Sequence, residues 1–142
     1  MARRVVLDTN VIVAALRSQR GAAARVLQRV GTGAFEHVLS VALILEYEAV
    51  CRRPSAAVRV DPEALDDVLD FLAQTAIRQP IHFLWRPTLR DPSDDHVLDL
   101  AVAAQASIVT YNRRDFRGAE EFGVEVLTPA ALLRRLPPEE TP

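Results

Sequence analysis

The stretch "RRVVLDTNVIVAAL", residues 3–16, begins as a buried strand and then places polar residues inside an apolar run. Three β-prone residues, Val5 to Leu7, are followed directly by Asp8, and apolar residues resume at Val11. Asp8 can cap a helix that begins near Val11, because acids favour helix N-termini. It can also carry chemistry, and the two roles are compatible.

Short strands and helices alternate along the rest of the chain. Apolar patterns predict strands at 4–8, 36–40, 107–111 and 124–128, and helices at 11–16, 21–30, 41–53, 61–75, 96–106 and 129–136. Residues 81–85 allow at most a short edge strand, because Pro80 and Pro87 flank them. This alternation is typical of a mostly parallel sheet with helices on both faces. We therefore expect a three-layer α/β/α fold with four to five strands.

The composition is that of a soluble globular protein, with 142 residues of which 49% are hydrophobic and 25% charged. We expect one domain over residues 1–136 and a flexible C-terminal tail at 137–142. No apolar run approaches the ~20 residues that a membrane span needs, so a cytoplasmic location and no membrane partner are expected. Cys51 is the only cysteine, which excludes an intramolecular disulfide and favours a small buried side chain.

The charged residues narrow the classes of function. The net charge of −2 argues weakly against a dedicated nucleic-acid binder, which usually carries a basic surface. All 17 basic residues are arginine, so mechanisms that need a lysine are excluded, phosphate-binding loops among them. A phosphatase of the haloacid-dehalogenase kind also places an Asp after its first strand. That class needs Asp-x-Asp and a lysine, and here the triplet is Asp-Thr-Asn.

Oxygen-bearing side chains gather where strands of the predicted sheet end, which is where ligands of parallel sheets bind. Helix capping explains a single acid at a helix start, but the three acids Asp91, Asp94 and Asp95 repel one another unless a positive charge lies nearby. The carboxylate of Glu46 lies beside an apolar helical stripe, where it costs free energy unless it is paired. Four stretches supply these groups: Asp8; Glu46; Asp91, Asp94 and Asp95; and Asn112 with Asp115.

Carboxylates without a thiol or imidazole partner suit a hard cation, and Mg²⁺ or Mn²⁺ fits best. The three histidines, His37, His82 and His96, share no metal-ligand spacing, and we expect them to be structural or surface groups. One use of such a cation is phosphodiester hydrolysis, because it activates water and neutralises charge on the phosphate. Three arginines near Asp115 are candidate phosphate contacts: Arg113, Arg114 and Arg117. The alternative, that they are ordinary surface residues, stays open.

Four motifs, in order, match a known family: "VVLDTNVIVAAL", "LSVALILEYEAV", "RDPSDDHVLDLAVAA" and "IVTYNRRDF". With these motifs the chain, from about Val5 to Leu136, resembles the PIN-domain ribonucleases, including the VapC-like toxins of bacterial toxin–antitoxin pairs. The resemblance implies a PIN-like fold over the predicted domain. It also implies a Mg²⁺- or Mn²⁺-dependent endoribonuclease that cleaves RNA and is silenced by a protein antitoxin.

The resemblance further assigns roles to single residues. Asp8 and Asp95 would be the main metal ligands, Glu46 and Asp115 would hold the metal or its waters, and Asn10 and Thr110 would orient these groups. Asp94 competes with Asp95, but the family's spacing favours Asp95 as the ligand and leaves Asp94 as the helix cap.

The fourth motif departs from the family pattern, because many members have an acid where this chain has Asn112. Asn112 can still offer a carbonyl oxygen, or Asp115 can act alone. The departure motivates a second hypothesis, a catalytically weak or inactive PIN-like module that binds RNA or a protein partner. The RNA target and the oligomeric state stay open, although homodimers are common in the family.

Overall fold

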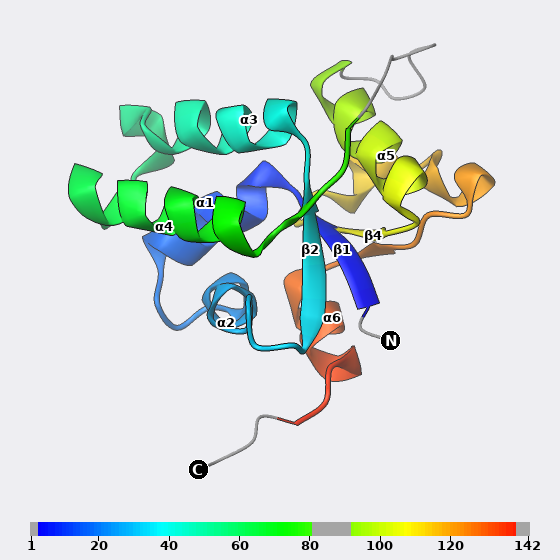
Figure 1. Ribbon diagram of the computed structural model, residues 1–142, viewed down its shortest axis with the longest axis horizontal. Coiled ribbons are helices and arrows are strands. Elements are labelled where there is room, and N and C mark those ends of the chain that lie inside the picture. Colours follow the sequence, from blue (N-terminus) through cyan, green and yellow to red (C-terminus); the bar gives the residue numbers. More distant parts are fainter. Residues whose placement is uncertain (1–2, 81–91, 139–142) are drawn as a thin grey trace.

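The residues that the structure describes, 3–80 and 92–138, fold around a five-stranded parallel sheet (Figure 1). The structure is a computed structural model, and it describes side chains for residues 3–80 and 96–138. The strands lie in the order β3-β2-β1-β4-β5, and every pairing is parallel. Their bounds are β1 Arg3–Leu7, β2 Phe35–Leu39, β3 Ile77–Arg78, β4 Ser107–Val109 and β5 Val126–Leu127.

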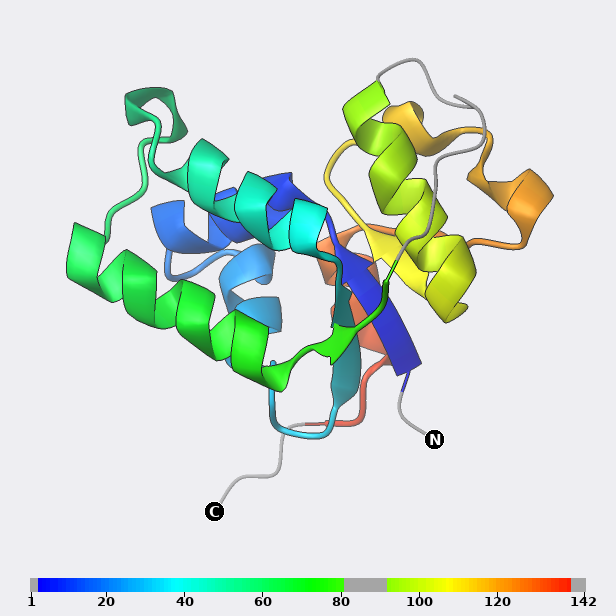
Figure 2. The same cartoon turned by 45° about the horizontal axis from the view of Figure 1, so that its top comes forward.

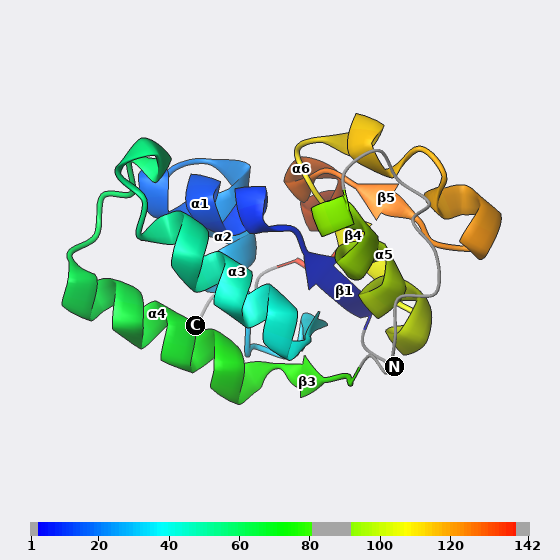
Figure 3. The same ribbon diagram turned by 90° about the horizontal axis from the view of Figure 1, so that it is seen from above.

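Helices cover both faces of this sheet. Helices α1 to α4 lie on one side and α5 lies on the other (Figures 1 and 3), and α6 packs against α2. The expected three-layer α/β/α fold is therefore confirmed. The helices are α1 Thr9–Arg17, α2 Ala22–Gln28, α3 Val41–Cys51, α4 Pro62–Thr75, α5 Pro92–Ala104 and α6 Pro129–Arg135, with 3-10 helices η1 Pro54–Ala56, η2 Arg113–Phe116 and η3 Ala119–Phe122.

Strand β1 is the central strand, and its apolar run is buried on both faces. Val5, Val6 and Leu7 are at most 1% exposed. Such continuous burial is typical of parallel strands covered by helices on both sides, which explains why this strand shows no alternation of apolar and polar residues. The chain leaves the sheet at Asp8 and begins α1 at Thr9.

Two other helix starts follow from local sequence signals. The Ser40 hydroxyl caps α3 by accepting from the Leu43 N–H at 3.1 Å. Asp61 caps α4 by accepting from the Ala64 N–H at 2.8 Å, with Pro62 at the first helical position, as predicted. The lone cysteine, Cys51, is buried at the end of α3, as expected.

The structure differs from the sequence-based prediction in two places after α4. The edge strand β3 at Ile77–Arg78 was not predicted; it forms because the chain pairs with β2 as soon as α4 ends. The possible edge strand at 81–85 lies outside the described residues. Helix α5 already begins at Pro92, so residue 94 lies in its first turn and is not its cap. The reason is the proline, whose fixed φ favours the first helical position. Residues 81–91, with His82, and 139–142 of the predicted tail lie outside the described residues.

Within the described ranges, no helix is both long and apolar enough to cross a lipid bilayer.

Candidate metal site at the carboxyl edge of the sheet

The neighbouring strands β1 and β4 end side by side, and a polar residue follows each of them. Leu7 pairs with Val109, and the Asp8 N–H donates to the Val109 carbonyl at 2.9 Å. The first residue beyond β1 is therefore Asp8, and the first beyond β4 is Thr110. Both are buried, at 7% and 0% exposed. The parallel register thus places two polar side chains at the carboxyl edge, where a ligand crevice is expected.

The Asp8 carboxylate accepts hydrogen bonds on both oxygens. Its Oδ1 accepts from the Thr9 N–H at 2.9 Å, which makes Asp8 the cap of α1. Its Oδ2 accepts from the Thr110 hydroxyl at 2.8 Å and from the Asn10 amide at 3.2 Å. Capping and a place in the site therefore coexist in this residue, and two side chains fix its orientation.

The surroundings of Asp8 raise the pKa of its carboxyl group. Burial is the largest cause, and the negative charges of Glu46 and Asp115 add to it, whereas the hydrogen bonds from Thr110 and Thr9 lower the pKa. Glu46 and Asp115 are therefore each near enough to Asp8 to repel its negative charge. A cation among them would relieve this repulsion, because an opposite charge favours the ionised form.

Glu46 reaches the site from the second turn of α3 and is held by two other elements. Its Oε2 accepts from the Thr9 hydroxyl, and its Oε1 lies 3.2 Å from Nε2 of His96. Thr9 is the first residue of α1, and His96 lies in α5. Glu46 therefore links the starts of two helices that lie on opposite sides of the sheet.

Next to Glu46, the fully buried Tyr47 supports the end of β1. Its hydroxyl donates to the Leu7 carbonyl at 2.5 Å. The pKa of Tyr47 lies well above its ordinary value, first because of burial and then because Asp8 and Glu46 are negative. The hydroxyl therefore keeps its proton and stays a donor.

The fourth motif forms a small network around Thr110. The Thr110 Oγ1 accepts from the Asn112 N–H at 3.0 Å and from the Asn10 amide at 3.2 Å, and Asn10 Oδ1 accepts from the Tyr111 N–H at 3.2 Å. The Asn112 amide donates to Asp115 Oδ2 at 2.6 Å. Asn112 therefore lies where it orients the Asp115 carboxylate.

The remaining predicted residues lie around this network. Arg113 and Arg114 are exposed in η2, and Arg117 is exposed just after it. Asp94 and Asp95 are in the first turn of α5, and their side chains lie outside the described part. Among the described side chains, no three of the His, Cys, Asp and Glu residues form a group that could hold a metal ion.

Two residues that hold Glu46 were not predicted from the sequence: Thr9 and His96. Thr9 stands between two predicted site residues, and a hydroxyl there is a signal that could have been used. His96 was expected to be structural or on the surface, but it contacts Glu46. The two residues are 50 positions apart, so this contact required knowing that the first turns of α5 lie beside α3.

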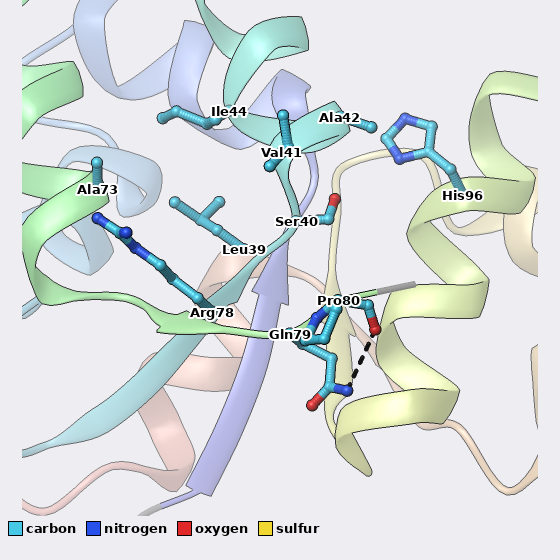
Figure 4. Close-up of a pocket in the computed structure, with 10 residues that line it drawn as sticks. All are labelled: Leu39, Ser40, Val41, Ala42, Ile44, Ala73, Arg78, Gln79, Pro80 and His96. Carbon is cyan, nitrogen blue, oxygen red and sulfur yellow. Dashed lines mark hydrogen bonds between the residues drawn. The ribbon is translucent and has the colours of Figure 1, made fainter. Parts of the chain in front are cut away.

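An apolar groove of about 600 Å³ adjoins the site beside His96 (Figure 4). The residues that line it include Leu39, Ile44 and Ala73, together with Pro80, which lies two residues after β3. On the same helix α3, Val41 is 75% exposed and Leu45 is 56% exposed. Val41 lines the groove and Leu45 lies four residues further along α3, so this part of α3 exposes apolar side chains beside the groove.

Comparison with known proteins gives a family and a fold. Residues 4–114 match the family model described as the PIN domain. The fold is similar to VapBC2 from Rickettsia felis, solved bound to a DNA fragment from their promoter, with TM-score 0.61 and 14% identity over 88% of this chain and 98% of that chain.

Two further solved structures are similar. VapBC-1 from nontypeable Haemophilus influenzae has TM-score 0.59 and 16% identity, covering 89% of this chain and 98% of that chain. FitAcB from Neisseria gonorrhoeae has TM-score 0.57 and 16% identity, covering 89% and 98%. Comparison with curated proteins finds no match. At such identities the solved structures show a shared fold.

Proposed function

The chain belongs to the PIN-domain family, a family of nucleases, and from this premise we propose that it is a metal-dependent endoribonuclease. It hydrolyses RNA phosphodiester bonds and serves as the toxin of a type II toxin–antitoxin pair. The observation that carries the proposal is the buried Asp8 carboxylate at the junction of β1 and β4, whose pKa the charges of Glu46 and Asp115 help to raise.

The chemistry of the donor set supports Mg²⁺ or Mn²⁺. The candidate ligands are carboxylate oxygens, which these hard cations prefer. Asp8, Glu46 and Asp115 are the described candidates; they do not form a three-ligand group by themselves, and we propose Asp95, whose side chain lies outside the described part, as the fourth member. His96, the next residue, touches Glu46, so the first turns of α5 lie beside the other acids. Asp94 then stays a supporting residue.

Each residue has a distinct role in the proposed reaction. When bound, the cation would supply a Lewis acid that lowers the pKa of a water and neutralises charge on the phosphate. Asp8 and Asp95 would hold it directly, and Glu46 and Asp115 would hold it or its waters. Thr110 and Asn10 fix the Asp8 carboxylate through its Oδ2. These two hydrogen bonds also favour the ionised form that a metal ligand needs.

We propose that the exposed arginines beside Asp115 contact the phosphates of the RNA. Arg113, Arg114 and Arg117 follow the strand that carries Thr110. A cluster of acids repels a phosphate backbone, so cations at its rim would bring the substrate to the site. Arginine suits this role because its planar fork binds phosphate in a bidentate manner.

The test of the function is cleavage of a mixed RNA pool with Mg²⁺ or Mn²⁺. Asp8→Asn keeps a side chain that caps helices as well as aspartate does, so the start of α1 is preserved. Its matched control is Asp61→Asn, the same change at the cap of α4. Asp61 lies at the end of α4 that is far from the sheet, because the helix is about 20 Å long at 1.5 Å per residue and leads into β3 at its other end. We expect wild type and Asp61→Asn to cleave and Asp8→Asn to lose at least ~100-fold in rate, as loss of one key electrostatic group typically costs.

Equal and negligible cleavage by wild type and Asp8→Asn would refute the enzyme. It would favour the alternative, a PIN-like module that binds RNA or a protein partner without cleaving.

We also propose a protein antitoxin as partner. The motifs of the sequence resemble those of VapC-like toxins from toxin–antitoxin pairs, and the fold is similar to the structures named VapBC2 and VapBC-1. This chain exposes Val41, which lines the apolar groove, and Leu45, four residues further along α3. An antitoxin segment that covers this surface would also block the adjacent carboxylates. Co-expression of this chain with the product of the adjoining gene tests the proposal. Leu45→Glu in this chain should abolish co-purification of the two proteins and leave RNA cleavage intact, and retained co-purification would contradict the proposed surface.

Three further points stay predictions. The domain is expected to span residues 1–136, and its oligomeric state, for which a homodimer is the expectation, can be measured by light scattering. For a protein that cleaves RNA, we expect a cytoplasmic location.

A further inference from the structure

Both carboxylate oxygens of Glu46 accept a hydrogen bond, and each donor comes from a different helix. Thr9, the first residue of α1, donates its hydroxyl proton to Oε2. His96, in α5, places Nε2 3.2 Å from Oε1. A carboxylate with one donor on each oxygen has a fixed rotation about its last bond. The two donors therefore define which way the Glu46 charge faces.

The His96 ring is nearly buried, and its polar environment is simple. Its side chain is 14% exposed, and the ring points from α5 toward the first turn of α3 near Ala42 (Figure 4). Among the described residues, Nδ1 is buried without a hydrogen-bond partner. Because an ionised carboxylate only accepts, Nε2 must carry the proton. The ring is thus set to donate to Glu46.

The contact between His96 and Glu46 also has a consequence for the position of α5. Helix α5 lies on the side of the sheet opposite α3 (Figure 2), and His96 follows Asp95 directly in its first turns. A hydrogen bond from His96 to α3 therefore limits how far the start of α5 can move away from Asp8 and Glu46.

We propose that His96 is a positioning residue of the metal site: through Nε2 it orients the Glu46 carboxylate and holds the start of α5, with Asp95, against α3. This inference rests on the proposed metal-dependent function. Partners that orient metal ligands typically contribute 10- to 100-fold to metal affinity or activity. The competing interpretation is that the ring merely fills space at the edge of the apolar groove.

Two substitutions separate these interpretations. His96→Phe keeps an aromatic ring of similar shape and removes the donor, whereas His96→Gln removes the ring and places an amide N–H near the position of Nε2. Packing alone predicts that phenylalanine is tolerated better, and positioning predicts that glutamine is. Thermal unfolding of both variants without metal measures the stability that packing contributes.

The experiment is calorimetric titration of Mn²⁺ into the full chain, with wild type, both His96 variants and Asp8→Asn. We expect His96→Phe to weaken Mn²⁺ binding about 10- to 100-fold, and His96→Gln to restore most of that loss. Wild-type affinity in His96→Phe, with binding lost in Asp8→Asn, would overturn the role of His96 and leave the metal site standing. Equally negligible binding by wild type and Asp8→Asn would overturn the metal site and this inference with it.

A second measurement does not depend on metal or on the folding of a His96 variant. Long-range ¹H–¹⁵N spectra of the metal-free wild type at pH 8 report which ring nitrogen of His96 is protonated. The proposal requires the Nε2–H tautomer, and it requires the Nε2 resonance to shift when Glu46→Gln removes the charged acceptor. An Nδ1–H tautomer, or a resonance that ignores Glu46→Gln, would overturn it.

Discussion

Replacing Tyr47 by phenylalanine removes one buried hydroxyl from the support of the strand end that carries Asp8. Tyr47 is 0% exposed, and its hydroxyl donates to the Leu7 carbonyl at 2.5 Å. Phenylalanine fills nearly the same volume, so no large cavity forms. What is lost is one buried hydrogen bond, and the carbonyl is left with one donor fewer. Such a loss costs about 1–2 kcal/mol of the free energy of unfolding.

Urea denaturation followed by circular dichroism measures this cost. With an m-value of about 2 kcal/mol per molar urea, the midpoint should fall by roughly 0.5–1 M. The control is Tyr111→Phe, the same change at a side chain that is 49% exposed, where less than about 0.5 kcal/mol is expected. If Tyr47→Phe shifts the midpoint no more than Tyr111→Phe does, the hydroxyl does not support the end of β1 and the reasoning is refuted.

Three further predictions concern pH and salt. Burial lowers the pKa of His37 from 6.5 to about 4. As the pH falls, the unfolded state therefore takes up the proton before the folded state does, and the free energy of unfolding should fall by about 3 kcal/mol between pH 6.5 and pH 4. His37→Gln should flatten this pH dependence in a urea series, and an unchanged slope would contradict it. The pKa of Tyr47 is raised in the folded state, so stability is lost as pH rises above about 10, where the unfolded tyrosine ionises. The difference in free energy of unfolding between wild type and Tyr47→Phe should therefore narrow above about pH 10 in the same assay, and a constant difference would contradict this. Replacing Arg113 and Arg114 by alanine should reduce the salt slope of RNA binding by about 1.4 in filter-binding measurements, at about 0.7 per phosphate contact with a single strand, and an unchanged slope would show that neither contacts RNA.

The sequence predicted the fold well, because the decisive signals are local. The apolar run of β1 and the cap and proline that start α4 follow from hydrophobic pattern and capping chemistry. Two features were missed: α5 begins at Pro92, before the predicted start at 96, and the two-residue strand β3 was not predicted. The short pairing of β3 with β2 and the first turn of α5 leave no strong apolar pattern in the sequence, which is why neither was predicted.

The candidate site divides in the same way. Asp8, Thr110 and Asn112 could be placed at strand ends from the sequence, and the structure brings them into one hydrogen-bonded network. The contact of His96 with Glu46 could not be predicted, because it joins helices on opposite sides of the sheet. Such a contact depends on packing distances, which a single sequence does not contain.

A divalent cation bound at Asp8, beyond the end of β1, would appear in an anomalous difference map from crystals soaked in Mn²⁺. We expect a peak about 2.0–2.2 Å from the Asp8 carboxylate, a distance close to that of Mg²⁺ from its oxygen ligands, with Asp95 as a second ligand. A map without a peak at Asp8, or with Asp8 and Asp95 pointing away from each other, would contradict this expectation.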